Sequence, residues 1–264
     1  TGVHVGLSFS ITGINYQLIR NGSPVGTPVS GTGSPLDFGL FTTPGTYTVN
    51  AVNATTGCGN AMTGAVVVTV SALPTVYNVG GGGNYCSGGT GLQITLDNSN
   101  TGINYQVYNG GSPVGGFVAG TGSAMNLGLQ TLAGTYTVVA VNSATGCTSN
   151  MSGSTMITID PLPTVYNVLG GGNYCAGGAG LNVTLSSSDI NFEYQLYRNG
   201  VLTGAPMNGT GLALDFGAQT LAGTYTIIAT NAVTATHCTS NMSGSAAITV
   251  NPVPAIFAVT GGGS

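Results

Sequence analysis

The sequence predicts an all-β protein made of three tandem β-sandwich repeats of about 89 residues each. Three observations predict this fold class. The chain is similar to itself at a fixed spacing, its apolar residues alternate with polar ones in short runs, and Gly, Asn, Ser and Pro separate these runs. No stretch has the period of an amphipathic helix. We therefore expect strands and turns throughout the chain.

The repeat is clearest in the segment Gly-Thr-Tyr-Thr-Val, whose third copy ends in Ile. Its tyrosine recurs at steps of 89 residues, as Tyr47, Tyr136 and Tyr225. The third period is two residues longer, because of an insertion within Asn231–His237. Short Pro-containing joints predict a domain lacking its first strand, two complete domains and the first strand of a further repeat, over residues 1–74, 75–163, 164–254 and 255–264.

Each period predicts a small sandwich. In the middle repeat, alternating runs predict strands over residues 92–96, 103–107, 125–127, 136–141 and 156–159. Asn-Gly pairs at 21–22, 109–110 and 199–200 predict hairpin turns, because both residue types tolerate positive φ angles. About seven short strands per period favour a Greek-key sandwich of the immunoglobulin-like type.

The tyrosines of the Gly-Thr-Tyr-Thr-Val segment have a more specific interpretation. In immunoglobulin-like domains, a Tyr near the start of strand F forms a tyrosine corner, in which its hydroxyl bonds to the backbone a few residues upstream. Tyr47, Tyr136 and Tyr225 match that position. The alternative is that these side chains only fill the core.

The five cysteines occupy two kinds of position. Cys86 and Cys175 lie in Asn-Tyr-Cys-x-Gly-Gly, whereas Cys58, Cys147 and Cys238 follow the presumed strand F. Pairing within each repeat predicts the disulfides Cys86–Cys147 and Cys175–Cys238. Cys58 is then left without a partner in this chain, because its partner belongs to a segment before the first residue. Disulfides imply an oxidising compartment; free, buried cysteines are the alternative.

The composition argues against several functions. Charged residues are 3% of the chain, and the only cations besides histidine are Arg20 and Arg198. Two arginines cannot neutralise a run of phosphates, so neither nucleic acid nor an anionic membrane surface is an expected partner. No apolar run approaches the roughly 18 residues of a membrane span, so membrane insertion is not expected either.

The titratable residues predict no chemistry. Catalysis requires a convergent set of such groups, and the few present do not recur in register. His4 and His237 occupy different positions in the repeat, and the cysteines lack metal-ligand spacing. A weak calcium site at Asp97–Asn100 is a minor alternative. We expect no enzyme, no catalytic residue, no metal and no cofactor.

Three strings carry a resemblance. They are Pro-Thr-Val-Tyr-Asn-Val-x-Gly-Gly-Gly-Asn-Tyr-Cys-x-Gly-Gly, Tyr-Gln-Leu-Tyr-Arg-Asn-Gly and Ala-Gly-Thr-Tyr-Thr-Val-x-Ala. They resemble the Ig-like tandem repeats of large secreted surface proteins from Bacteroidetes-type bacteria. The resemblance covers the whole chain and implies secretion to the cell surface, often by the type IX route, in adhesin-like or gliding-associated proteins. It carries no catalytic residues.

The phase of the repeat suggests how the chain continues. It starts inside one repeat and stops inside another, five residues short of three periods. Either it is a window of a longer polypeptide, or it is a subunit that joins its neighbours head to tail. In the second case a strand is donated to the first domain of the next copy. That polymer-contact strand comprises Ala255, Ile256, Phe257, Ala258 and Val259.

We therefore expect a structural repeat array that forms an extracellular fibre, filament or stalk at a bacterial surface. Its main partner is then a further copy of itself, or the continuation of the same chain. The alternative is an adhesin module that binds glycans or other surface ligands through its uncharged surface of Thr, Asn, Ser and Tyr.

Overall fold

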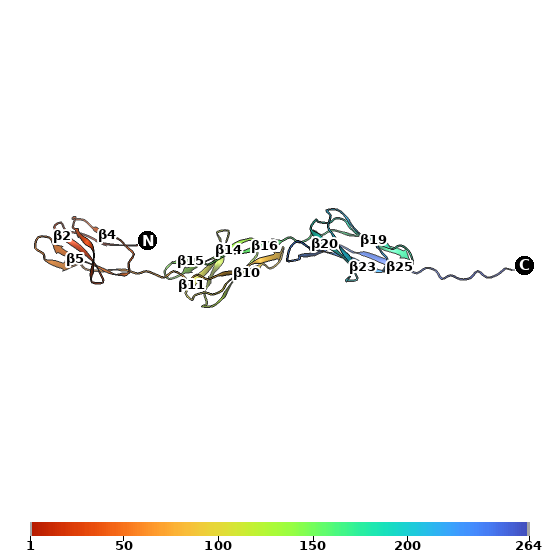
Figure 1. Cartoon of the computed structure of the whole chain (residues 1–264), viewed down its shortest axis with the longest axis horizontal. Coiled ribbons are helices and arrows are strands. Elements are labelled where there is room, and N and C mark those ends of the chain that lie inside the picture. Colours follow the sequence, from red (N-terminus) through yellow and green to blue (C-terminus); the bar gives the residue numbers. More distant parts are fainter. Residues whose placement is uncertain (1, 263–264) are drawn as a thin grey trace. The chain divides into compact units, whose positions relative to one another are not determined.

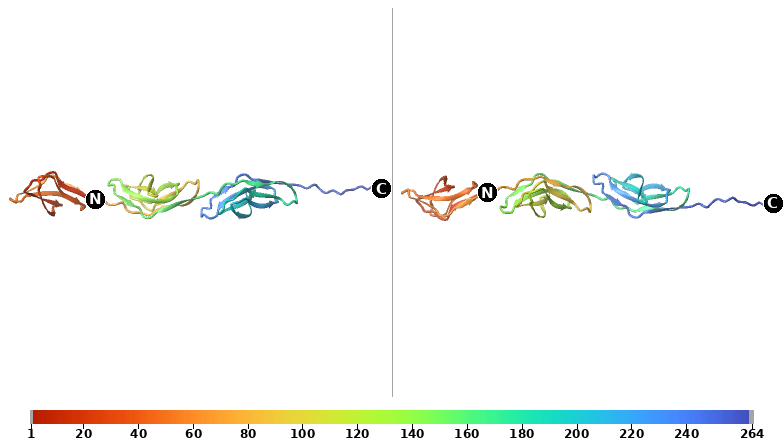
Figure 2. Two further views of the ribbon diagram at one scale, coloured as in Figure 1. Left: turned by 90° about the horizontal axis from the view of Figure 1, so that it is seen from above. Right: turned by 90° about the horizontal axis from the view of Figure 1, so that it is seen from below.

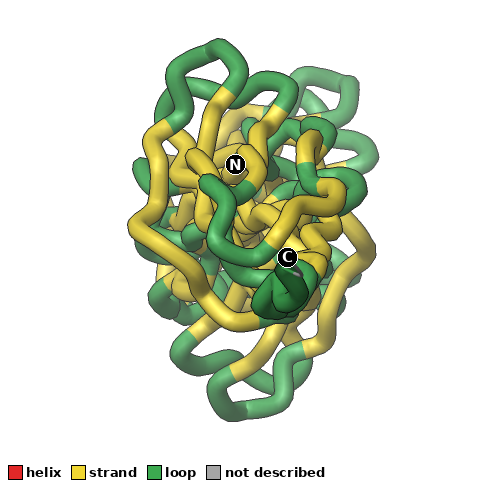
Figure 3. Tube along the Cα trace, turned by 90° about the vertical axis from the view of Figure 1, so that its right-hand side faces the viewer, coloured by secondary structure: helices red, strands yellow, loops and turns green. Residues whose placement is uncertain are grey.

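A computed structural model describes residues 2–262, which form strands and loops and no helix (Figure 3). The all-β prediction is confirmed. The chain divides into two compact units, Thr1–Leu73 and Pro74–Ser264. The first unit holds one sandwich and the second unit holds two (Figure 1). We call them the first, second and third sandwich in chain order.

The first sandwich consists of two sheets. The smaller sheet pairs β1 (Val3–Leu7) with β4 (Leu36–Phe41) in antiparallel fashion. The larger sheet has the order β3-β2-β5-β6, and β7 also pairs with β5. Its strands are β2 (Ile14–Arg20), β3 (Ser23–Ser30), β5 (Gly45–Asn53), β6 (Gly59–Ala61) and β7 (Val66–Val68).

The second sandwich adds one strand to each sheet. Its smaller sheet has the order β13-β10-β8 and contains β8 (Val79–Gly81), β10 (Leu92–Leu96) and β13 (Met125–Gln130). Its larger sheet has the order β12-β11-β14-β16-β9, with β15 on β14. The strands are β9 (Gly83–Cys86), β11 (Ile103–Asn109), β12 (Ser112–Ala119), β14 (Gly134–Asn142), β15 (Thr148–Asn150) and β16 (Thr155–Asp160).

The third sandwich follows the plan of the second. Its smaller sheet joins β17 (Val168–Gly170), β19 (Leu181–Leu185) and β22 (Leu214–Gln219). Its larger sheet contains β18 (Gly172–Cys175), β20 (Phe192–Arg198), β21 (Val201–Asn208), β23 (Gly223–Asn231), β24 (Thr239–Asn241) and β25 (Ala246–Asn251). In both complete sandwiches the first strand therefore crosses from one sheet to the other.

Residues 252–262, which follow β25, have no strand structure (Figure 2). We use the word tail for residues 255–262. All of these residues are exposed. The predicted polymer-contact strand, Ala255–Val259, thus has no sheet partner in the structure.

Each sandwich has its own hydrophobic core, which includes a buried tyrosine near the start of β5, β14 or β23. The Tyr136 hydroxyl donates a hydrogen bond to the Leu132 carbonyl at 2.7 Å. Tyr47 and Tyr225 make the same bond to the carbonyl four residues upstream. The tyrosine corner is therefore confirmed in all three repeats.

A second buried tyrosine in each core is followed by a glutamine, in the pairs Tyr16-Gln17, Tyr105-Gln106 and Tyr194-Gln195. Gln106 is 4% exposed. Its Nε2 donates to the carbonyls of Val107 and Val114, where the register between β11 and β12 shifts. Gln17 and Gln195 make equivalent bonds. The amide satisfies carbonyls that the bulge leaves without a ladder partner.

The hairpin prediction is correct in two repeats and wrong in one. Asn21 and Asn199 adopt the left-handed region, with φ of 50° and 48°. In the second sandwich, Gly110 and Gly111 form the turn, with φ of 56° and 86°. Asn109 is instead the last residue of β11. The asparagine of that repeat falls one position before the turn, where no positive φ is needed.

Candidate functional site

The candidate site is the place where a first strand docks, and the second sandwich shows how it is occupied. Val79 lies opposite Leu96 of β10. On the other side, the Val79 amide donates to the Ser152 carbonyl at 2.9 Å, and the Ser152 amide donates to the Tyr77 carbonyl at 2.8 Å. The Asp97 amide donates to the Asn78 carbonyl at 3.2 Å. The strand is therefore held along both of its edges.

The third sandwich repeats these contacts. Val168 lies opposite Leu185 of β19, and its amide donates to the Ser243 carbonyl at 2.9 Å. The Ser243 amide in turn donates to the Tyr166 carbonyl at 2.8 Å. Val168 is 7% exposed and belongs to the core. The first strand thus contributes to the core as well as to the hydrogen bonding.

The first sandwich has a groove at the same place. Among the described residues, β1 pairs only with β4, so its other edge carries no strand. A groove of about 310 Å³ runs along this edge. Its walls include Val5, Gly6, Leu7, Ser8, Met62 and Thr63. At a spacing of 89 residues, these match the residues of the second sandwich that hold β8. We call this the acceptor groove.

Two core residues are left partly open beside the acceptor groove. Leu96 and Leu185 are 1% and 0% exposed, but their counterpart Leu7 is only half-buried. Met151 and Met242 are each 6% exposed. Their counterpart Met62 is again half-buried. The first sandwich therefore exposes core surface that the other two sandwiches cover with their first strand.

A second hollow of about 320 Å³ adjoins the groove and shares Met62 with it. We call it the apolar pocket. Ile11, Ile14 and Tyr16 line it, and Cys58 lies at its wall. In the third sandwich the residue matching Ile11 is Asp189. There an aromatic residue of the first strand covers the carboxylate.

That aromatic residue is Tyr166, whose hydroxyl donates to Asp189 Oδ1 at 2.6 Å. The Thr164 amide donates to Oδ2 of the same carboxylate at 2.9 Å. Burial opposes ionisation of Asp189, but these hydrogen bonds outweigh it and lower the pKa of the carboxyl. The bond to Asp189 raises the pKa of Tyr166. The pair fixes the first strand through a charge-assisted hydrogen bond.

In the second sandwich a different acid holds the first strand. Asn78 donates its side-chain amide to Asp97 Oδ2 at 2.7 Å and its backbone amide to Oδ1 at 2.9 Å. Both bonds favour the ionised carboxyl, so the pKa of Asp97 is lowered. The corresponding residue of the first sandwich is Ser8, on the wall of the empty acceptor groove.

The disulfide prediction was wrong in its pairing. Cys86 bonds to Cys238, with a Cα–Cα distance of 5.6 Å, while Cys58, Cys147 and Cys175 are free. Cys86 ends β9 beside Asp160, near the start of β14, whereas Cys147 follows the end of β14. A strand of nine residues separates the two, which is roughly 30 Å. A disulfide within the repeat cannot span that distance.

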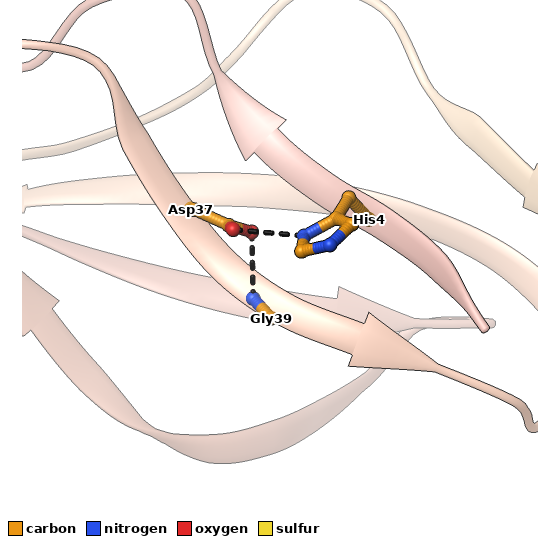
Figure 4. A network of polar contacts seen from close by, with 3 residues as sticks. All are labelled: His4, Asp37 and Gly39. Atoms are coloured by element: carbon orange, nitrogen blue, oxygen red, sulfur yellow. Dashed lines mark hydrogen bonds and ion pairs between the residues drawn. The ribbon is translucent and has the colours of Figure 1, made fainter. Parts of the chain in front are cut away.

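The one close contact between a histidine and a carboxylate in the described chain has a structural role. His4 Nδ1 lies 2.8 Å from Asp37 Oδ2, and Asp37 Oδ1 accepts from the Gly39 amide at 2.8 Å (Figure 4). The bond from Gly39 is the main reason why the pKa of Asp37 is lowered. In the third sandwich, Asn182 donates to Asp215 at the same place, again at 2.8 Å. The pair therefore ties two adjacent strands together.

The described residues contain no group of three or more potential metal-binding side chains. Among residues 2–262, no helix has the length and apolar character needed to cross a membrane.

One repeat of the chain matches a known family. Residues 72–161 match the family described as Ig-like domain CHU_C associated. The three N-terminal domains of the highly immunogenic outer capsid protein of bacteriophage RB49 are 14% identical, with 95% of each chain covered and a TM-score of 0.39. The full ectodomain of mouse nectin-like molecule 4 is 13% identical, with 97% of each chain covered and a TM-score of 0.37. The search of curated proteins returned no match.

Proposed function

We propose that the chain is a non-enzymatic subunit of an extracellular structural array, in which the tail of one copy completes the first sandwich of the next. One observation carries this proposal. The acceptor groove of the first sandwich is open where the other two sandwiches hold a first strand, and the tail of the same chain matches those first strands but is exposed. The Ig-like match and the disulfide support a location outside the cytosol. Addition of a strand to an open sheet edge is a known mode of protein association.

The register of the tail follows from the repeat. Val259 matches Val79 and Val168, and Phe257 matches Tyr77 and Tyr166. Phe257 is 84% exposed and Val259 is fully exposed. Burying each of these side chains contributes about 1.5–3 kcal/mol. In the acceptor groove, Val259 would lie opposite Leu7 and against the half-buried core.

The chemistry of the apolar pocket matches the tail better than it matches the other first strands. Tyr166 has a hydroxyl, and its pocket supplies the acceptor Asp189. Phe257 has no hydroxyl, and the matching pocket of the first sandwich has Ile11 in place of the acid. A Tyr hydroxyl buried against Ile11 would lose its hydrogen bonds to water without replacement. The tail and the first sandwich therefore differ from the third sandwich in a complementary way.

The side chain before Phe257 provides a matched control. Ile256 matches Val76 and Val165, which are 53% and 54% exposed although their strands are docked. A polar substitution at Ile256 should therefore leave docking intact. The same substitution at Phe257 or Val259 places a carboxylate in the apolar pocket or the acceptor groove.

The experiment compares Phe257→Asp, Val259→Asp and Ile256→Asp at equal concentration. All three are made in a Cys175→Ser background, which removes the exposed thiol nearest to the tail. Light scattering after size exclusion, together with electron microscopy, measures assembly. We expect the parent and Ile256→Asp to form head-to-tail polymers and the other two to remain monomers. Equal assembly of all three variants would overturn the proposal.

The native material gives a second test. Under reducing and denaturing conditions, the array should separate into chains of about the mass of this sequence, 26.0 kDa. A single chain many times larger would show that consecutive sandwiches are continuous in one polypeptide, and strand donation between copies would then be wrong.

A further inference from the structure

The junction between the second and third sandwiches contains a covalent link that sequence reasoning missed. Cys86 lies at the end of β9, paired with Asp160 at the end of β16. Cys238 lies in the hairpin between β23 and β24 and is 1% exposed. Their disulfide joins residues 152 positions apart. It therefore connects the end of one sandwich to a hairpin of the next.

Polar contacts surround this disulfide. Thr236 Oγ1 donates to the Asp160 carboxylate, and Asn231 Nδ2 donates to the Pro161 carbonyl at 3.4 Å. Both donors belong to the same region of the third sandwich as Cys238. Hydrogen bonds as well as the disulfide thus hold the hairpin against the end of β16.

Both halves of this arrangement occur again without a partner, the strand-end half at Cys175 and the hairpin half at Cys58 and Cys147. Cys175 ends β18 beside Asn251 of β25, as Cys86 ends β9 beside Asp160. The Ala176 amide donates to the Asn251 carbonyl at 2.8 Å, and the Ser87 amide donates to the Asp160 carbonyl at 2.9 Å. Cys175 is nevertheless exposed and free.

The first sandwich has one of the two unpaired hairpin halves. Cys58 lies in the hairpin between β5 and β6, and its carbonyl accepts from the Asn53 amide at 2.9 Å. The Cys238 carbonyl accepts from Asn231 in the same way, at 2.8 Å. Cys58 is exposed and free, and it lies at the wall of the apolar pocket.

The length of the connecting chain brings these halves together. From Asp160 at the end of β16 to Val168 in its docked position, the chain advances eight residues. From Asn251 at the end of β25 to Val259 of the tail, it also advances eight residues. A tail docked in the register given above therefore enters the first sandwich through a connection of the same length.

We infer that Cys175 of one copy and Cys58 of the next copy form an intermolecular disulfide that locks each donated tail in place. This inference rests on the proposed strand donation. Two thiols form one S–S bond, and their two hydrogens and two electrons reduce a protein or small-molecule disulfide to two thiols. Oxidised glutathione serves as that oxidant in the test.

The test is a denaturing gel without reductant after assembly in the presence of oxidised glutathione. We expect a ladder at multiples of 26.0 kDa, which reductant collapses to one band. Cys58→Ser and Cys175→Ser should each abolish the ladder. Cys147→Ser is the matched control, because Cys147 occupies the same kind of hairpin position as Cys58 but belongs to the second sandwich; its ladder should persist.

A mixture of the two single variants tests whether Cys175 of one copy bonds to Cys58 of another. Cys58→Ser retains only the Cys175 half, and Cys175→Ser retains only the Cys58 half. Mixed together, they should give a covalent dimer and nothing larger, and mass spectrometry of its digest should contain the Cys58–Cys175 peptide pair. A ladder that depends on Cys147, or the absence of a ladder from the parent, would overturn the inference.

The failure of this inference can be told apart from failure of strand donation. Polymers that appear in electron microscopy but run as monomers on the gel would overturn the disulfide and leave strand donation standing. The absence of polymers as well as of the ladder would overturn both.

Discussion

The first and third sandwiches have the same sheet order and the same tyrosine corner, but only the third has a first strand. The difference in burial is local. Val5 and Tyr47 are as buried as their counterparts, whereas Leu7 and Met62 are more exposed than Leu185 and Met242. The first strand therefore covers one part of an otherwise complete sandwich. The proposed donation of this strand by another copy would leave the rest of the fold unchanged.

The largest expected difference between these sandwiches is in amide hydrogen exchange. The Ser186 and Ser243 amides donate to the first strand of the third sandwich. Their counterparts Ser8 and Thr63 face the empty groove. In the monomeric Val259→Asp protein, we expect Ser8 and Thr63 to exchange faster by orders of magnitude, because no strand protects them. NMR-detected exchange measures this directly.

A synthetic peptide of the tail should then slow exchange at Ser8 and Thr63 and nowhere in the third sandwich. A peptide with Asp in place of Val259 is the control and should leave the rates unchanged. Protection of Ser8 and Thr63 in the absence of peptide would contradict an open groove.

The second prediction exchanges the chemistry of the two pockets. Ile11→Asp gives the first sandwich the acid that the third has at Asp189. Binding of the tail peptide should weaken about tenfold or more, because Phe257 covers the carboxylate but lacks the hydroxyl that Tyr166 donates to Asp189. A peptide carrying Phe257→Tyr should recover much of this loss. Calorimetric titration of both proteins with both peptides gives the coupling free energy between positions 11 and 257. Independent effects of the two substitutions on the binding free energy would contradict the complementarity of Phe257 and Ile11.

The third prediction concerns what the sandwiches share. Replacing Tyr47, Tyr136 or Tyr225 by Phe removes the corner hydrogen bond and should lower the free energy of unfolding by about 1 kcal/mol in each case. The effects should be similar, because the three bonds are 2.9, 2.7 and 2.7 Å long and do not involve the first strand. Amide hydrogen exchange in the core of each sandwich, measured at increasing denaturant concentration, tests this. A much larger loss at one site would show that the corners are not equivalent.

The smallest effect is a dependence on pH. The pKa of Asp97 is lowered by Asn78, so its stabilisation of the first strand is present above the unfolded pKa and is lost as pH falls through the lower, folded value. Protection of the Asn78 amide should therefore decrease in acid, and Asp97→Ser should remove that dependence. Docking of the tail against Ser8 involves no such group, so peptide affinity should change less over the same range.

The sequence was sufficient for those features that depend on local pattern. Alternating residues such as Leu92–Leu96 predicted strands, and the upstream backbone bond of Tyr136 followed from its position in the motif. The single Phe at position 257, where the other repeats have Tyr, was also readable, although its meaning required the pocket around Ile11.

The cysteine pairing could not be derived in the same way. The repeat spacing is equally consistent with pairing inside a repeat and pairing between neighbours, because both keep the register. Only the strand directions decide, since β14 places Cys86 and Cys147 at its opposite ends. The insertion within Asn231–His237, next to Cys238, was the one local signal that this hairpin has a neighbour to contact. The domain boundaries expected at residues 74, 163 and 254 remain predictions.

The disulfide between the second and third sandwiches has a consequence for resistance to proteases. The two sandwiches are joined twice, by the backbone that leaves β16 and by the bond between Cys86 and Cys238. Leu162, in that connecting backbone, is 44% exposed and open to attack. A cut there would leave the two fragments attached through the disulfide, and each sandwich would keep its own sheets intact. Two independent lesions, one hydrolytic and one reductive, are needed to separate them.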